Sequence, residues 1–194
     1  MYFIGGLPKP GGYDTILVVV DRLARYAHFV ALAHPYSAKE VAEVFLNGVV
    51  KLYNFPESIV SNTYRIFMSK FWIELFKLAG RGLKFSSAYH PQSDGQTEVV
   101  NKCLETYLRC MTGKKPRQWH KWLSLAELWY NTNYHESIKL TPFKGLYVRD
   151  PPPIIRGDVP ATPIDEVSTM LKDINEMLRV MKEHLEQAQN HMKH

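Results

Sequence analysis

Short apolar runs rich in β-branched residues alternate along this chain with longer stretches of helical periodicity, and this alternation restricts the fold more than any other feature. Residues 15–20 and 26–32 are two such runs, separated only by a short polar segment, which predicts two adjacent strands. Residues 59–61 and 83–87 predict two more strands. Strands and helices mixed in this order predict an α/β domain with a mostly parallel centre.

The helices are predicted from capping residues and from apolar positions three and four residues apart. Ser37 and Glu40 form a capping box before a helix that extends to about residue 53. Ser69 caps a second helix, which Gly80 ends. Two longer helices are predicted later in the chain, over residues 96–111 and 117–134.

The composition supports a hydrophobic core. Of the 194 residues, 45% are hydrophobic and 12% aromatic, which predicts one domain with an appendage. No stretch approaches the ~20 apolar residues needed to span a bilayer, and no basic segment with an apolar signal core stands at the N-terminus. We therefore expect an intracellular protein. Cys103 and Cys110 lie seven residues apart in one helical pattern, where we predict small buried side chains and neither a disulfide nor a zinc site.

The net positive charge comes from the first part of the chain. The net charge is +5, but residues 1–153 carry 19 Lys and Arg against 12 Asp and Glu, whereas residues 154–194 carry five against seven. A basic excess of this size suits a polyanionic partner, although many soluble domains are mildly basic without binding one.

A group of motifs in the middle of the chain is specific to one family. Glu98 closes the sequence Gly-Gln-Thr-Glu, and 35 residues separate it from Asn62. The sequence His-Pro-Gln-Ser-Asp-Gly comes just before, at residues 90–95. These features closely resemble the integrase catalytic core of long-terminal-repeat retrotransposons of the Ty3/gypsy type. The resemblance extends to residues 14–23, 26–29, 129–132, 135, 141–143 and 146–147 and covers about residues 1–153. It implies an RNase H-like fold, a mixed five-stranded sheet flanked by helices.

The resemblance also implies three metal-binding carboxylates, of which this chain keeps one. Aspartates are expected where Tyr2 and Asn62 stand, and Glu98 matches the third acid. Two Mg²⁺ ions in such a site activate the nucleophile and stabilise the leaving oxygen, and Mg²⁺ prefers charged oxygen ligands. Asn62 offers a neutral carbonyl oxygen and Tyr2 a phenol that is protonated at neutral pH. We therefore predict a catalytically inactive protein without a bound cofactor, in which Glu98 is the only metal ligand left.

Other positions depart from the family pattern or offer further acids. The family usually has an acid where Tyr64 stands and a glycine where Val148 stands. Asp21 and Asp94 are the acids nearest to the motif, but we predict that Asp21 is a structural hydrogen-bond acceptor and Asp94 a loop residue. The family's first strand begins upstream of the first aspartate, so we expect a shortened strand and an N-terminally truncated core.

Basic residues interleaved with aromatic ones provide candidate DNA contacts. The candidates are Arg65, Lys102, Arg109, Lys114, Lys115, Arg117 and Lys121. Both alternatives stay open for them, because lysines and arginines on a solvated surface give the same pattern; Lys102 and Arg109 also lie on a helix face where ion pairs are expected. We predict that the tryptophans belong to the core and that His90 and His135 form local hydrogen bonds.

The end of the chain carries a separate signal. Residues 154–162 predict a linker and residues 163–194 a helix with an apolar seam over four heptads. The seam comprises Ile164, Val167, Leu171, Ile174, Leu178, Met181, Leu185, Ala188 and Met192. This helix either pairs with a second copy, giving a homodimer, or packs on its own core domain.

Together these features predict a retrotransposon-derived integrase core. Its ancestral role is DNA integration, it is inactive, and it retains at most weak, nonspecific binding to DNA; its expected location is nuclear. The alternative is a protein-interaction scaffold that associates through its C-terminal helix and has no need of DNA.

Overall fold

The structure is a computed structural model. It describes residues 1–9, 11–61, 66–85, 91–112, 116–152, 164–169, 171–172, 176, 179–180 and 183, and for residues 83–85, 91–98, 110 and 116–118 it describes the backbone alone.

The strands form two sheets. β1 (Tyr2–Ile4), β2 (Tyr13–Val20) and β3 (Ala27–Ala33) make an antiparallel sheet in the order β1-β2-β3. β4 (Ser58–Ser61) and β5 (Gly82–Phe85) form a parallel pair. The sequence analysis predicted one sheet of five strands, and the described residues do not contain it. The two sheets meet where the amine of Met1 donates a hydrogen bond of 2.7 Å to the carbonyl of Val60.

Helical segments fill most of the remaining chain. They are α1 (Ala38–Phe45), the π-helical η1 (Leu46–Val50), α2 (Lys51–Tyr53), α3 (Lys70–Leu78), α4 (Pro91–Thr112), the 3₁₀-helical η2 (Pro116–Trp122), α5 (Leu123–Thr132) and α6 (Pro142–Tyr147). The helix predicted after Ser37 does reach Tyr53, although its middle is π-helical. The helix predicted over residues 96–111 begins earlier, at Pro91. The helix predicted over residues 117–134 is instead divided into η2 and α5. α6 was not predicted.

Two serines begin helices as their spacing predicted. Ser37 Oγ accepts a hydrogen bond of 3.2 Å from the amide of Glu40, and Glu40 Oε2 accepts one of 2.6 Å from the amide of Ser37. This reciprocal pair is a complete capping box, and it satisfies two amides that the first helical turn leaves without partners. Ser69 Oγ accepts a hydrogen bond of 3.5 Å from the amide of Trp72 at the start of α3.

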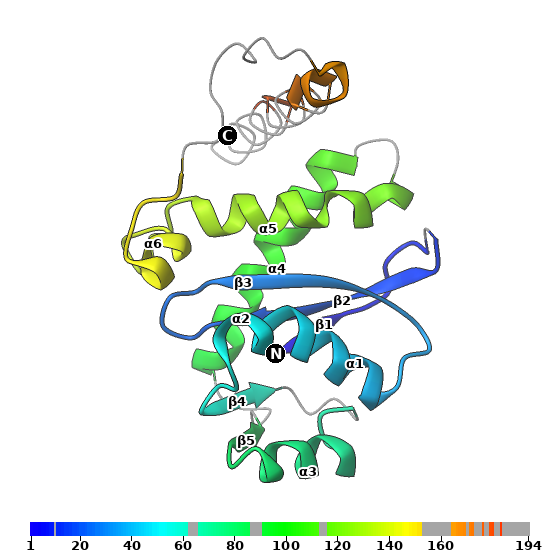
Figure 1. Ribbon diagram of the computed structural model, residues 1–194, viewed down its shortest axis with the longest axis vertical. Helices are drawn as coiled ribbons and strands as arrows, with labels where there is room; N and C mark the ends of the chain where they lie inside the picture. The colour runs from blue at the N-terminus through cyan, green and yellow to red at the C-terminus, as the bar shows by residue number, and fades with distance from the viewer. Residues whose placement is uncertain are drawn as a thin grey trace.

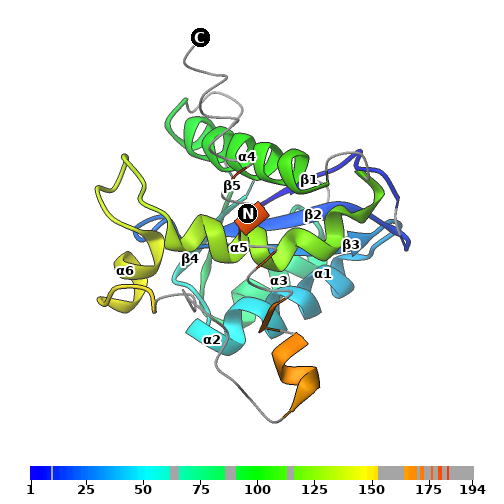
Figure 2. The same ribbon diagram turned by 90° about the horizontal axis from the view of Figure 1, so that it is seen from above.

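The antiparallel sheet separates two hydrophobic cores. Along β2, Ile16 and Val18 pack against α4, η2 and α5, whereas Leu17 between them packs against α1 and α3. Alternating side chains of a strand point to opposite faces, so an apolar run of this kind fits a strand covered on both sides. Figures 1 and 2 show the two groups of helices on opposite sides of the sheet.

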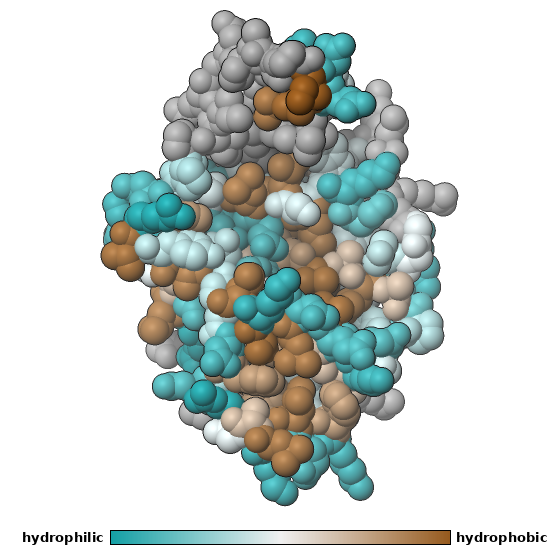
Figure 3. All heavy atoms as spheres, viewed as in Figure 1, coloured by the Kyte–Doolittle hydropathy of each residue, from teal (hydrophilic) through white to brown (hydrophobic). Residues whose placement is uncertain are grey.

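Some apolar side chains remain on the outside of these helices. Figure 3 shows a band of hydrophobic residues along the middle of the face that carries α1 and α2, with polar residues on both sides. Leu52 in α2 is 58% exposed, and Leu23 in the turn between β2 and β3 is 89% exposed. Single exposed apolar residues are common on folded proteins, so this band alone identifies no partner.

The predicted C-terminal helix lies largely outside the described residues, as does the predicted linker at residues 154–162. The residues that are described between Asp165 and Glu183 are helical, and Arg179 forms ion pairs with Glu176 and Glu183. Within the described part of the chain, no helix is long and apolar enough to cross a membrane.

Candidate active site

Tyr2, at the first position of the expected catalytic site, is buried in an apolar core. Tyr2 lies on β1, is 6% exposed, and belongs to the core cluster that includes Val100 and Leu104 of α4. Its hydroxyl has no hydrogen-bond partner among the described residues. Burial raises the pKa of the Tyr2 phenol well above its usual range, and the neighbouring Tyr130 and Cys103 raise it further. The side chain at this position is therefore a neutral phenol inside a hydrophobic cluster.

The second position follows a strand that ends next to β1. β4 ends at Ser61, which is 1% exposed, and Asn62 itself lies outside the described residues. The hydrogen bond from the Met1 amine to the Val60 carbonyl brings the start of β1 against this strand. Asn62 is therefore the residue that follows β4, and β4 contacts β1, the strand that carries Tyr2.

For the third position, Glu98, the structure describes the backbone alone. Glu98 lies in α4, two residues before the buried Val100, and its side chain is outside the described part of the structure. Because Val100 and Leu104 pack in the same cluster as Tyr2, α4 crosses the sheet beside β1. The mutual placement of the three side chains at positions 2, 62 and 98 stays a prediction.

Asp21 has the structural role that was predicted for it. Its Oδ1 accepts hydrogen bonds from the amides of Leu23 and Ala24, at 3.0 and 2.6 Å, and so closes the turn between β2 and β3. Because both hydrogen bonds come from amides of the turn, the Asp21 carboxylate stabilises that turn. Asp94 lies in the first part of α4, not in a loop as predicted, and its side chain is not described.

No metal centre is found in the described part of the chain, since no three His, Cys, Asp or Glu side chains there come together. Position 2 does not fit such a centre, because a buried neutral phenol does not supply the charged oxygen that Mg²⁺ prefers. Cys103 is a free, partly buried thiol packed against the core, and burial raises its pKa. The side chain of Cys110 lies outside the description.

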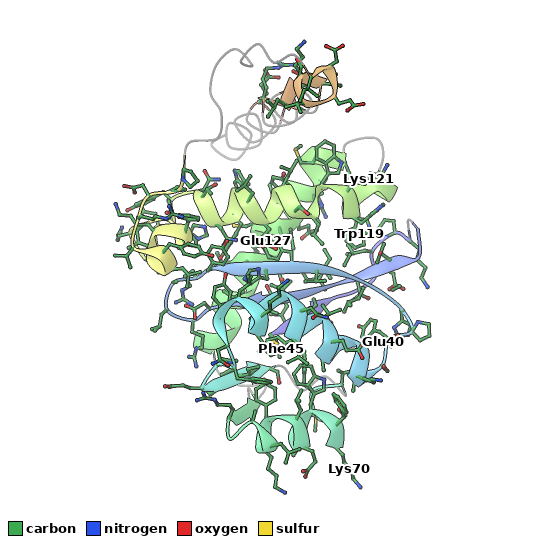
Figure 4. All side chains as sticks on the ribbon, in the orientation of Figure 1. Glu40, Phe45, Lys70, Trp119, Lys121 and Glu127 are labelled. Carbon is green, nitrogen blue, oxygen red and sulfur yellow. The ribbon has the colours of Figure 1, made fainter. Side chains whose placement is uncertain are left out.

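Three of the candidate DNA-contacting residues have described side chains. Lys102 and Arg109 lie on the exposed side of α4, and Lys121 is exposed on η2, which packs against α4. Arg109 is paired with Glu105 at 2.6 Å, as expected for a helix surface. Lys121, labelled in Figure 4, lies in the last turn of η2, just before α5 begins. The other candidates are outside the description, wholly for Arg65, Lys114 and Lys115 and in the side chain for Arg117.

The tryptophans of η2 and α5 belong to the core, as predicted. Trp119 is 2% exposed, and its indole nitrogen donates a hydrogen bond of 2.8 Å to the carbonyl of Pro8. Trp122 and Trp129 are partly buried against the same core. His135 forms the predicted local hydrogen bond, from Nε2 to the Tyr130 carbonyl at 2.9 Å. His90 lies outside the described residues.

The sequence analysis missed a polar network along the outer edge of β3. Glu127 of α5 contacts His28 Nδ1 at 3.0 Å through Oε1 and accepts the amide of Phe29 at 2.9 Å through Oε2. His28 Nε2 lies 3.3 Å from the hydroxyl of Tyr53, which lies 3.4 Å from that of Tyr147. Figure 4 shows Glu127 between α5 and β3. Two of these residues, His28 and Tyr147, stand in segments that match the family, and this was the available signal in the sequence.

The sequence of this chain is similar to those of known proteins. No family model matches the chain. The chain is 35% identical over 144 residues to the Transposon Tf2-3 polyprotein of Schizosaccharomyces pombe, and the match covers 74% of this chain but 11% of the polyprotein. The Tf2-4 polyprotein of the same organism matches equally. The chain thus spans about a tenth of the length of these curated relatives.

Solved structures agree with the fold. The catalytic core domain of BIV integrase aligns with a TM-score of 0.56 at 20% identity, over 76% of this chain and 94% of that one. The HTLV-2 integrase catalytic core domain in complex with magnesium, in its trimeric form, aligns with a TM-score of 0.57 at 18% identity, over 74% and 93%. The fold is therefore the α/β fold of an integrase catalytic core. Together with the Tf2 relationship, it places this chain among the integrase cores of Ty3/gypsy-type retrotransposons.

Proposed function

We propose that this chain is an integrase core that no longer cleaves or joins DNA strands and retains weak, sequence-nonspecific DNA binding. The observation that carries the proposal is the burial of Tyr2 in an apolar cluster at the position of an expected catalytic aspartate. The Asn62 amide adds a second neutral ligand where a charged one is expected. Glu98 is then the one acid of the family motif that could approach Mg²⁺.

The expected loss of rate is large. Metal assistance supplies several kcal/mol of transition-state stabilisation in such reactions. Since each ~1.4 kcal/mol is tenfold in rate, losing it slows the reaction at least roughly a thousandfold.

A strand-transfer and 3′-processing assay tests this part of the proposal. The unmodified chain should give no product with Mg²⁺ or Mn²⁺, and Glu98→Gln should change nothing. Activity that disappears in Glu98→Gln, in a preparation otherwise identical, would refute the claim of inactivity.

Restoring the acids tests the assignment of the site independently. Tyr2→Asp combined with Asn62→Asp should gain a thermal stabilisation by Mn²⁺ that the unmodified chain lacks, because two carboxylates then join Glu98. The same pair with Glu98→Gln should lose that stabilisation. Tyr2→Asp also places a carboxylate among Val100 and Leu104, so the variant should be less stable without metal. Equal responses to Mn²⁺ with and without Glu98→Gln would show that these three positions do not form one site.

DNA binding is proposed from the basic surface of α4 and η2. Lys102, Arg109 and Lys121 are exposed there, and phosphate contacts by such residues make binding strongly dependent on salt. Lys121→Ala should weaken binding to unrelated duplexes equally and reduce the slope of log K against log salt by about one. Lys77→Ala on α3, also an exposed lysine, is the matched control and should leave the slope unchanged. A slope near zero for the unmodified chain would contradict this part of the proposal.

The second candidate is a protein-interaction scaffold that dimerises through residues 163–194. The heptad seam favours it: of the seam residues that are described, Ile164 and Val167 are 53% and 42% exposed and Leu171 is half-buried. Leu171→Asp with Leu178→Asp should give a folded monomer in sedimentation experiments if the seam pairs two copies. Unfolding of this variant would instead assign the helix to its own core domain. Retention of a protein partner at high salt favours this candidate over DNA binding.

A further inference from the structure

The hairpin that joins β1 to β2 is fixed against η2. The Trp119 indole donates a hydrogen bond of 2.8 Å to the carbonyl of Pro8 in this hairpin, and Trp119, labelled in Figure 4, is 2% exposed. The ring of Tyr13, the first residue of β2, lies 5.7 Å from the ring of His120, with an angle of 30° between the two planes. Figures 1 and 2 show the end of the hairpin beside η2. Segments 111 positions apart in the chain thus form one surface.

Tyr13 and His120 form an aromatic pair on this surface. Tyr13 is 38% exposed, whereas His120 is half-buried. His120 also contacts the buried ring of Trp119, with the centroids 6.2 Å apart and the planes at 89°. The pair is thus supported from the core, while part of the Tyr13 ring stays in contact with water. A single exposed tyrosine is common on folded proteins, so the charges around the pair decide whether it marks a site.

The chain around this aromatic pair is basic. Residues 106–126 contain five Lys and Arg and no Asp or Glu. Lys121, which directly follows His120, is exposed. The acid closest to the pair in sequence, Asp14, is 8% exposed and forms an ion pair of 3.1 Å with Lys9. The surface beside the pair therefore suits an anionic ligand.

An exposed aromatic ring beside cations fits an unpaired nucleotide. Proteins bind single strands by stacking bases on aromatic side chains along a basic surface that follows the phosphates. Within a duplex both faces of a base are covered by its neighbours, so only an unpaired base has a face free to stack on Tyr13. Single-stranded and duplex DNA therefore use different parts of this surface.

We propose that Tyr13 and His120 form a stacking site for an unpaired DNA base, at the point where a single strand leaves a duplex bound to α4 and η2. This inference rests on the DNA binding proposed above and adds single-stranded tails to the DNA that the chain binds. Lys121 contacts a phosphate of the strand, and the Tyr13 ring covers one face of a base. Because every base has such a face, the site does not discriminate between sequences.

Three DNA molecules separate base stacking from phosphate contacts. They are a blunt duplex, the same duplex with a single-stranded thymidine tail, and the same duplex with an abasic tail of equal length. In fluorescence anisotropy with the full chain, the thymidine tail should strengthen binding at least about fivefold over the abasic tail, because stacking adds to the phosphate contacts that both tails share. Equal affinity for the two tailed duplexes would overturn the stacking site.

Two exposed tyrosines give the matched variants. Tyr13→Leu should reduce the ratio of the two affinities, thymidine tail over abasic tail, to about one, whereas Tyr13→Phe keeps a ring and should preserve it. Tyr134→Leu is the control, because Tyr134 is 59% exposed but follows α5 at the end away from η2. It should leave the ratio within about twofold of the unmodified value. The ratio does not depend on how much of a preparation is folded, since both DNAs meet the same protein. A ratio that Tyr13→Leu leaves unchanged, or that both Leu variants reduce equally, would refute the location of the site.

The blunt duplex distinguishes this inference from the proposed DNA binding. A chain that binds the blunt and the thymidine-tailed duplex equally would lack the stacking site and still bind DNA as proposed. A chain that binds the thymidine-tailed duplex alone, and loses it in Tyr13→Leu, would support the stacking site and contradict duplex binding. Absence of binding to all three DNA molecules would overturn both.

Discussion

Asn131 joins α5 to β3 through both polar atoms of its side chain, and Asn131→Ala should lower the free energy of unfolding by about 4 kcal/mol. Its Oδ1 accepts the amide of Ala27 and its Nδ2 donates to the carbonyl of Ala27, both at 2.8 Å. Asn131 is 2% exposed and Ala27 is fully buried. Truncation therefore leaves two backbone groups without a partner and out of reach of water, at about 1–3 kcal/mol each.

Urea denaturation measures this loss. With an m-value of about 2 kcal/mol per M, the midpoint should fall by roughly 2 M, while m itself stays constant. Such a loss is a large part of the 5–15 kcal/mol that stabilises a typical domain.

Asn133→Ala is the matched control. Asn133 stands two residues further on, is exposed, and donates one local hydrogen bond to the carbonyl of Trp129. Its removal should cost about 0.5 kcal/mol or less. A cost below about 1 kcal/mol for Asn131→Ala, or similar costs for both variants, would refute the argument that α5 is fixed to β3 by this side chain.

Three further results are expected. Val148→Gly should stabilise the fold by about 1 kcal/mol in thermal or urea unfolding. The reason is that Val148 ends α6 with a φ of 56°, in the left-handed region that a β-branched residue adopts only with strain. A loss of stability would contradict this explanation. Burial lowers the pKa of His135, so the unfolded chain binds more protons than the folded one between the lowered pKa and about 6.5. Stability should therefore fall as the pH drops through that window, and His135→Gln should reduce the slope of a plot of stability against pH. Ser37→Ala removes the side-chain acceptor of the capping box with Glu40 and should cost about 1 kcal/mol, whereas no measurable cost would show that the box contributes little.

Local features of the fold could be predicted because each depends on residues close together in the chain. A capping box needs only Ser37 and Glu40, three positions apart. The two-sided burial of β2 follows from its continuous apolar sequence. The role of Asp21 follows from a turn that it closes with the next three residues.

The candidate site was only partly predictable. The motif identifies Tyr2, Asn62 and Glu98 as the positions of interest, and the chemistry of phenol and amide indicates that two of them cannot replace carboxylates. The sequence does not indicate that the Tyr2 phenol is buried against α4, because that depends on how a helix about a hundred residues later crosses the sheet.

Contacts between distant segments decided the remaining features. The sequence alone determined the order of most strands and helices, the caps that begin α1 and α3, and the family to which the chain belongs. Tertiary structure decided the division of the helix predicted at residues 117–134, where the Trp119 indole donates a hydrogen bond to the carbonyl of Pro8, 111 positions earlier in the chain. It also decided the pairing of Asn131 with Ala27, 104 positions away. The physical reason is that propensity and capping act over one or two helical turns, whereas these hydrogen bonds exist only once separate layers have packed.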